Sequence, residues 1–157
     1  MPDVVNLQRK IKLDLAPIRA FVARLSKTVA ESKNSTFTVA FIGDGRMKQL
    51  NELFRSKATT TDVLSFPHEP DNFGGSTDFS HQPAEGVTPS PVFLGDVVIS
   101  AEQAAKQALE NDLTLEGEFK QLILHGLLHL CGYDHETDNG EMNAREDLLR
   151  PAHVETP

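Results

Sequence analysis

The sequence has few of the features that mark secreted or membrane proteins. Its single cysteine, Cys131, excludes a disulfide within the chain and is typical of a reducing compartment. No apolar run reaches the ~20 residues that a membrane-spanning helix needs. The N-terminal stretch MPDVVNLQRK has neither the apolar core of a signal peptide nor the composition of a transit peptide. With 157 residues of ordinary globular composition, we expect one domain over 1–157, located in the cytoplasm and without a membrane partner.

Basic side chains are scarce in the second part of the chain. Residues 59–157 carry four Lys or Arg against eighteen Asp or Glu, a balance of −14, whereas residues 1–58 carry eleven against five, a balance of +6. The whole chain has a net charge of −8, which argues against a general nucleic-acid binder. The asymmetry favours a locally positive face on an acidic protein, although helices solvated by charges of either sign explain it equally well.

Hydrophobic periodicity predicts helices mixed with strands. The predicted helices cover 15–32, 45–55, 101–110, 114–131 and 139–150. The predicted strands cover 36–42, 62–66 and 93–100, where β-branched and aromatic residues cluster. Because strands and helices do not alternate strictly, we predict an α+β fold with a small mixed β-sheet of about four strands covered by helices.

Two finer expectations concern the second helix and the region after the second strand. Asp44 is placed to cap the helix over 45–55, whose apolar residues are expected to face inward. Those residues are Met47, Leu50, Leu53 and Phe54. Residues 67–91 are rich in Pro, Gly, Ser and Asp, which predicts a long loop of the kind that is usually functional or mobile.

The most informative segment is HGLLHLCGYDH, residues 125–135. His125 and His129 are four residues apart on a predicted helix, so their side chains lie on one face about 40° apart. Gly132 permits the left-handed turn that ends the helix and brings His135 back to the same point. Three imidazoles with one open coordination position indicate a catalytic zinc site with one Zn²⁺ per chain.

This spacing matches the zinc-binding helix of the metzincin peptidases with one departure. Those enzymes place a glutamate directly after the first histidine, as the general base for the metal-bound water. Here that position is Gly126, which has no side chain to take a proton. The metal ligands are kept and the peptidase base is missing, which strongly disfavours a metallopeptidase.

Four neighbouring residues admit a structural interpretation beside a functional one. Asp134 is either a rival ligand or orienter of an imidazole, or a turn residue that caps local N–H groups. Cys131 is interpreted as a small buried hydrophobe. Tyr133 either hydrogen-bonds near the site or packs. Met142 either forms an apolar floor beneath the metal or belongs to the helix core.

The segment HGLLHLCGYDH closely resembles the signature H-G-x-L-H-L-x-G-Y-D-H of the YbeY family of rRNA maturation factors and endoribonucleases. Two further segments match that family, RSKATTTDVLSFP (55–67) and LGDVVIS (94–100). The match runs with gaps over roughly residues 37–147 and departs from the family in its longer loop over 67–93.

The resemblance implies a metal-dependent, single-strand-specific endoribonuclease in small-subunit rRNA maturation and ribosome quality control. It maps the zinc ligands to His125, His129 and His135, and a functionally important arginine to Arg55. It also implies contacts with ribosomal proteins or a ribosome-associated GTPase. On the residues alone, Arg55 is equally well a solvated residue at a helix end.

The chemistry of RNA cleavage agrees with such a site. A metal polarises a phosphoryl oxygen or supplies hydroxide, and an arginine neutralises the charge that develops on the phosphate. RNA also carries its own nucleophile, the 2′-OH. The metal hydroxide and the 2′-OH therefore both remain candidate nucleophiles. We expect part of the basic set to line a groove leading to the zinc, with Arg55 closest to the phosphate. That set is Arg19, Arg24, Lys27, Lys48, Arg55 and Lys57. The alternative from another functional class is a metal-stabilised ribosome-assembly factor without turnover.

Overall fold

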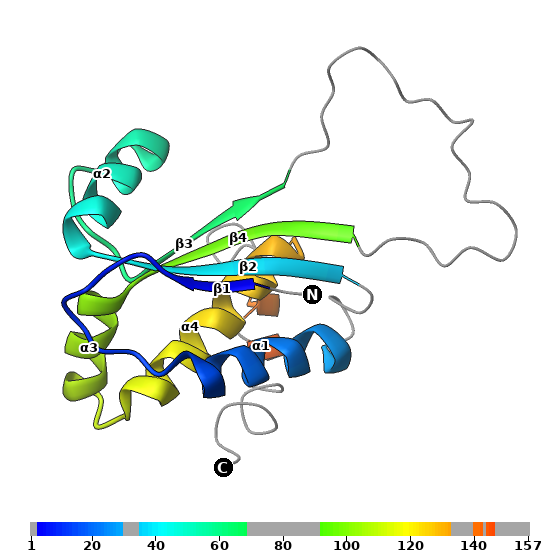
Figure 1. The fold of residues 1–157 in the computed structure, drawn as a ribbon. Coiled ribbons are helices and arrows are strands. Elements are labelled where there is room, and N and C mark those ends of the chain that lie inside the picture. Colours follow the sequence, from blue (N-terminus) through cyan, green and yellow to red (C-terminus); the bar gives the residue numbers. More distant parts are fainter. Residues whose placement is uncertain (1–2, 30–34, 69–91, 133–139, 143, 147–157) are drawn as a thin grey trace, which may run out of the picture.

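The computed structural model describes residues 3–29, 35–68, 92–132, 140–142 and 144–146. Its elements in chain order are β1 (Asp3–Asn6), α1 (Leu15–Thr28), β2 (Ser35–Ile42), α2 (Asp44–Arg55), β3 (Val63–Pro67), β4 (Val92–Ser100), α3 (Ala101–Glu110) and α4 (Leu115–Leu130) (Figure 1). Residues 141–142 and 144–146 are also helical, within the range predicted for the last helix. The loop predicted over 67–91 lies almost entirely outside the described residues.

The four strands form one mixed sheet in the order β1-β2-β4-β3. β1 and β4 both run parallel to β2, and β3 runs antiparallel to β4 at the edge of the sheet. The predicted α+β class and strand number are therefore confirmed. The position of β1 was not predicted, because its sequence DVVN is too short to show a period and acquires its strand conformation by pairing with β2.

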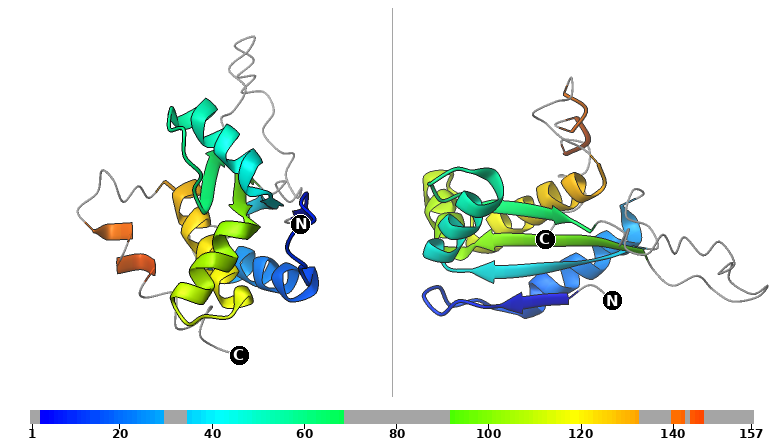
Figure 2. Two further views of the ribbon diagram at one scale, coloured as in Figure 1. Left: turned by 90° about the vertical axis from the view of Figure 1, so that its left-hand side faces the viewer. Right: turned by 90° about the horizontal axis from the view of Figure 1, so that it is seen from above.

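One face of the sheet is covered by α1 and α4, and this layer holds the main core (Figure 1, Figure 2). β2 and β4 contribute alternate residues to it because successive strand side chains point to opposite faces. These residues are Phe37, Val39, Phe41, Val97 and Ile99. The apolar residues of α1 and its C-cap are buried in the same core: Ile18, Phe21, Val22, Leu25 and Val29. The two aromatic rings of Phe41 and Phe119 meet with centroids 4.7 Å apart.

α2 lies on the opposite face of the sheet, where a second, smaller apolar cluster forms (Figure 1). Met47 is fully buried there against Leu64 and Val98. The prediction that Leu53 and Phe54 also face inward is wrong, since they are 74% and 60% exposed. The reason is that α2 rises away from the sheet along its length, so that in its last turn only an edge of the Phe54 ring reaches β3, at Phe66 (Figure 1).

Asp44 is the first residue of α2, and the N-cap is Gly43, which contradicts the predicted cap. The Asp44 carboxylate instead accepts hydrogen bonds from Thr60 at 2.5 Å, Ser100 at 3.1 Å and Gln103 at 3.2 Å. Burial raises the pKa of Asp44, but these three hydrogen bonds outweigh it and the pKa is lowered. Asp44 thus ties the start of α2 to α3 and to the segment before β3.

The remaining helix ends follow their sequence signals. Ser100 caps α3 by accepting from the Gln103 N–H at 3.3 Å, and Thr114 caps α4 by accepting from the Gly117 N–H at 3.0 Å. Gly132 follows α4 with φ +104, the left-handed conformation predicted for it. Within the part of the chain that the structure describes, no helix is long and apolar enough to cross a membrane.

Candidate metal centre and its surroundings

Helix α4 places two of the predicted ligands next to each other. The Nε2 atoms of His125 and His129 are 3.2 Å apart, and their ring centroids are 4.7 Å apart. Two nitrogens that each lie 2.0–2.1 Å from a tetrahedral zinc are about 3.3–3.4 Å from each other. Both rings are only half-buried. The two imidazoles therefore have the convergence and the access that a shared zinc requires.

The buried carboxylate of Glu146 contacts the imidazole of His125 at Nδ1, the ring nitrogen that is not directed at His129. Oε1 of Glu146 lies 2.5 Å from Nδ1 of His125, and Glu146 is 9% exposed. A carboxylate at Nδ1 selects the tautomer with the proton on that nitrogen, which leaves the lone pair of Nε2 directed at His129. Sequence reasoning missed Glu146. One signal could have found it, because it stands four residues after Met142, which is fully buried, so the two share a helix face.

The third predicted ligand, His135, lies outside the described residues, as do Tyr133 and Asp134. Among the residues that are described, no group of three or more His, Cys, Asp or Glu side chains is arranged to hold a metal ion. The three-histidine zinc site stays a prediction, of which the structure describes the His125–His129 pair.

Gly126 faces the sheet. A Cβ atom there would lie 2.6 Å from Cγ1 of Val97 and 3.2 Å from Oγ of Ser65, closer than van der Waals contact allows. Oγ of Ser65 also donates to the carbonyl oxygen of Gly126 at 3.1 Å. The position after the first histidine therefore needs glycine so that α4 can approach β4. A glutamate at this position would enter the sheet layer, which is a steric reason for the absence of the peptidase base.

The two sulfur-containing residues near the histidines belong to the packing of the core. Cys131 is partly buried against the main core, as interpreted from the sequence. Met142 is fully buried in the same core. Both residues thus contribute to the packing of the main core.

Strand β3 connects the histidine helix with α2. Ser65 contacts α4 through Gly126 on one face of the sheet. On the other face, the ring of Phe66 meets the ring of Phe54 at 5.1 Å in an edge-to-face arrangement. Arg55, the last residue of α2, directly follows Phe54 and is exposed. The guanidinium is thus carried by the helix end that contacts β3, on the face opposite α4.

The six basic residues, part of which was expected to line a groove leading to the zinc, lie on two separate helices and the turn after one of them. Arg19, Arg24 and Lys27 belong to α1, on the same face of the sheet as α4. Lys48 and Arg55 belong to α2 on the other face, and Lys57 follows this helix. The sheet separates the two groups, so the expectation that part of the set lines a groove applies to one group at a time and stays a prediction.

Comparisons with known proteins show to which family the chain belongs. Residues 3–151 match the model of the family described as Endoribonuclease YbeY. The chain belongs to this family. An Endoribonuclease YbeY of Thermodesulfovibrio yellowstonii is 32% identical over 159 residues, which cover 93% of this chain and 91% of the relative. The Endoribonuclease YbeY of Solibacter usitatus is 40% identical over 133 residues, covering 85% of this chain and 75% of the relative.

A solved structure supports the fold. The solution structure of a Thermotoga maritima protein superimposes with a TM-score of 0.57 at 24% identity, covering 100% of this chain and 97% of the other. Membership of the YbeY family confirms the resemblance found in the sequence and implies an RNA-cleaving hydrolase with an RNA substrate.

Proposed function

We propose that the chain is a zinc-dependent, single-strand-specific endoribonuclease that acts in small-subunit rRNA maturation and ribosome quality control in the cytoplasm. The observation that carries the zinc assignment is the 3.2 Å separation of the two Nε2 atoms of His125 and His129, with the Glu146 carboxylate behind the first ring. The family match supports cleavage of RNA.

Each residue of the proposed site has one role. His125, His129 and His135 hold the ion, which when bound supplies Lewis acidity toward a phosphoryl oxygen. Glu146 keeps the lone pair of His125 Nε2 directed at the ion by accepting a hydrogen bond from the Nδ1–H group of the ring. Because Gly126 has no side chain, α4 can lie against Val97. This contact fixes the height of both histidines above the sheet.

Arg55 is proposed to meet the scissile phosphate by reaching from the end of α2 past β3, the edge strand that contacts both α2 and α4. A guanidinium presents paired N–H donors that match two phosphate oxygens, and it remains charged at every physiological pH. Its interaction strengthens as negative charge develops in the transition state, so it contributes to the rate of cleavage more than to ground-state binding.

The test is incubation of purified protein with labelled single-stranded RNA, with and without a chelator, and with zinc added back. A His129→Ala variant prepared identically excludes a contaminating nuclease. Cleavage that the chelator abolishes and zinc restores is expected from the wild type alone. A 2′,3′-cyclic phosphate at the product end would identify the 2′-OH as nucleophile. Absence of any cleavage that depends on His129 would overturn the proposal in favour of a ribosome-assembly factor without turnover.

A further inference from the structure

The last turn of α2 exposes large apolar side chains that the fold does not use. Leu53 and Phe54 are 74% and 60% exposed, whereas Met47 on the first turns of the same helix is fully buried. Exposed apolar side chains that lie together commonly mark an interaction surface. Their position next to β3 places this surface beside the strand that also contacts the histidine helix.

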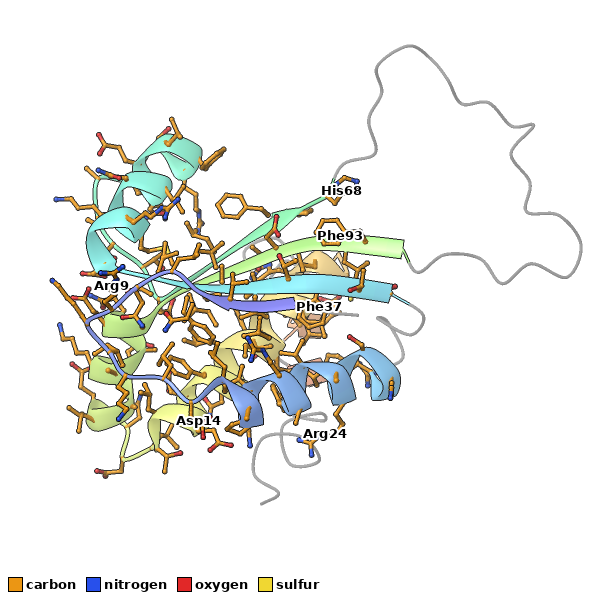
Figure 3. The ribbon with its side chains drawn as sticks, viewed as in Figure 1. Arg9, Asp14, Arg24, Phe37, His68 and Phe93 are labelled. Carbon is orange, nitrogen blue, oxygen red and sulfur yellow. The ribbon has the colours of Figure 1, made fainter. Side chains whose placement is uncertain are left out.

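The exposed ring of Phe54 is part of a series of aromatic side chains. It meets Phe66 of β3 with ring centroids 5.1 Å apart. His68 follows the end of β3, and its N–H donates to the carbonyl oxygen of Leu94 at 2.9 Å, which extends the pairing with β4 and places His68 on the same face as Phe66. The His68 ring meets that of Phe93 at 5.2 Å, and both lie at the far end of β3 and β4 (Figure 3). We call these four residues, Phe54, Phe66, His68 and Phe93, the aromatic track.

The charges around the start of the track are mainly positive. Four basic side chains on α2 and the turn after it are exposed, against one exposed acidic side chain, Glu52. The basic residues are Arg46, Lys48, Arg55 and Lys57. This is the reverse of the net charge of −8 on the whole chain. The acidic side chain opposite Phe66, Asp96, is half-buried and accepts a hydrogen bond from the Thr38 hydroxyl.

The turn after α2 is held in one conformation, which fixes the cations relative to the ring of Phe54. Ser56 has the left-handed φ of +57, and its N–H donates to the carbonyl oxygen of Glu52 at 3.1 Å. The Lys57 N–H donates to the carbonyl oxygen of Asn51. Nδ2 of Asn51 in turn donates to the carbonyl oxygen of Thr59 at 2.7 Å. An ordered turn of this kind presents its charges without a large loss of entropy on binding.

We propose that the aromatic track is a binding surface for unpaired bases of single-stranded RNA, with Phe54 as its most exposed stacking platform. Aromatic rings combined with flanking cations are the pattern by which proteins bind single strands, because every base has a face that can stack and every phosphate is negative. A protein partner would need no such excess of cations around an apolar surface. The inference rests on the proposed function, and it adds the part of the substrate that lies away from the scissile phosphate.

The test uses the absence of tryptophan from the chain, which also has only one tyrosine. Phe54→Trp introduces a single indole fluorophore at the start of the track. The probe is a single-stranded 2′-O-methyl oligonucleotide of about twelve nucleotides. It lacks the 2′-OH and is added with a chelator present, so binding is measured without cleavage or metal. We expect the indole fluorescence of Phe54→Trp to be quenched on titration with the oligonucleotide. The matched control is Leu109→Trp, at an 83% exposed apolar site on α3, whose fluorescence should not change.

Affinity provides the second readout. Phe54→Leu keeps an apolar side chain but removes the ring, and it should weaken binding of the oligonucleotide by about tenfold or more. Phe54→Trp should restore the affinity of the wild type, and Leu109→Ala should leave it unchanged. An RNA duplex of the same sequence should bind without any dependence on Phe54, since its bases are already stacked.

The two proposals fail in distinguishable ways. Oligonucleotide binding that depends on the Phe54 ring, in a protein that shows no chelator-sensitive cleavage, would support the track and refute the nuclease assignment. Wild-type affinity in Phe54→Leu would overturn the track even if the protein cleaves RNA. The track would also be overturned if the fluorescence of Phe54→Trp did not change on titration with the oligonucleotide. The same holds if Phe54→Leu differed from the wild type only in its self-association.

Discussion

The Glu146 carboxylate lies 2.5 Å from Nδ1 of His125, while Nε2 of the same ring lies 3.2 Å from Nε2 of His129. The imidazole of His125 thus contacts the carboxylate through Nδ1, while its Nε2 is directed at His129. Twenty-one positions separate His125 from Glu146 in the chain, so this relationship is a product of the fold. It makes the presentation of His125 dependent on the helical residues after α4.

Removing the Glu146 carboxylate should weaken zinc binding. We expect Glu146→Ala to lower zinc affinity about 10- to 100-fold, because the ring of His125 loses its fixed tautomer and orientation. Glu146→Gln keeps an oxygen acceptor, so its zinc affinity should lie between those of the wild type and Glu146→Ala. The measurement is competition for zinc with a chromophoric chelator, with Glu110→Gln, an exposed site on α3, as control. Wild-type affinity in Glu146→Ala would show that the carboxylate has no role at the site.

Gly126 should tolerate no larger residue. We expect Gly126→Ala to lower the free energy of unfolding by about 1–3 kcal/mol, because its Cβ would lie 2.6 Å from Val97. Adding Val97→Ala should recover part of this loss in a double-mutant cycle. In contrast, Gly45 on α2 has nothing within 4 Å of an added Cβ. Gly45→Ala should therefore gain about 0.5–1 kcal/mol in urea unfolding. Equal stabilities of wild type and Gly126→Ala would refute the close contact.

A buried carboxylate near the start of α4, Glu118, should make stability depend on pH. Burial raises the pKa of Glu118, and the negative charge of Asp62 raises it further. With the Gln107 amide nitrogen turned toward them, it lies 3.0 Å from Glu118 Oε1 and 3.1 Å from Asp62 Oδ2. The folded state holds the Glu118 proton more tightly than the unfolded chain does. The corresponding stability is present below the ordinary pKa of 4.5 and is lost as the pH rises through the folded-state pKa.

Glu118→Gln should remove this loss, since its amide stays neutral. We expect the variant to gain stability relative to wild type as the pH is raised from about 4 to about 7, measured by chemical denaturation at several pH values. Glu110→Gln, at an exposed position, should show a difference that does not grow with pH. A stability difference for Glu118→Gln that is the same at every pH would contradict the expected proton linkage.

Arg55 should affect cleavage more than binding. We expect Arg55→Ala to lower the single-turnover cleavage rate about a hundredfold or more, with a smaller effect on RNA affinity. Lys48→Ala should instead reduce the salt dependence of binding by about one unit and leave the zinc content unchanged. Lys106→Ala, at an exposed basic position on α3, serves as the control for the cleavage rate. Cleavage by Arg55→Ala at the wild-type rate would remove Arg55 from the mechanism.

Local signals predicted some boundaries of the elements. The predicted range 101–110 coincides with α3, and Gly132 ends α4 as expected, because helix ends and left-handed turns depend on residues only a few positions apart. The placement of His125 and His129 on one face follows from helical spacing in the same way.

Contacts between residues that are distant in the chain could not be predicted from the sequence. Leu53 and Phe54 have the spacing of an inner helix face, and only the angle at which α2 leaves the sheet exposes them. The spacing from Met142 marks Glu146 as a residue of an inner helix face, but its contact with His125 depends on where the chain returns after α4. Gly126 was interpreted as a missing base, whereas its contact with Val97 shows a packing requirement at the same position.

The central claim is tested most directly by cleavage of single-stranded RNA with protein of measured zinc content. The account predicts one zinc per chain, a cleavage rate proportional to zinc occupancy, and loss of both in His129→Ala together with a lower melting temperature. A chelator should abolish cleavage and added zinc should restore it. Cleavage that persists unchanged in zinc-free protein or in His129→Ala would contradict the account.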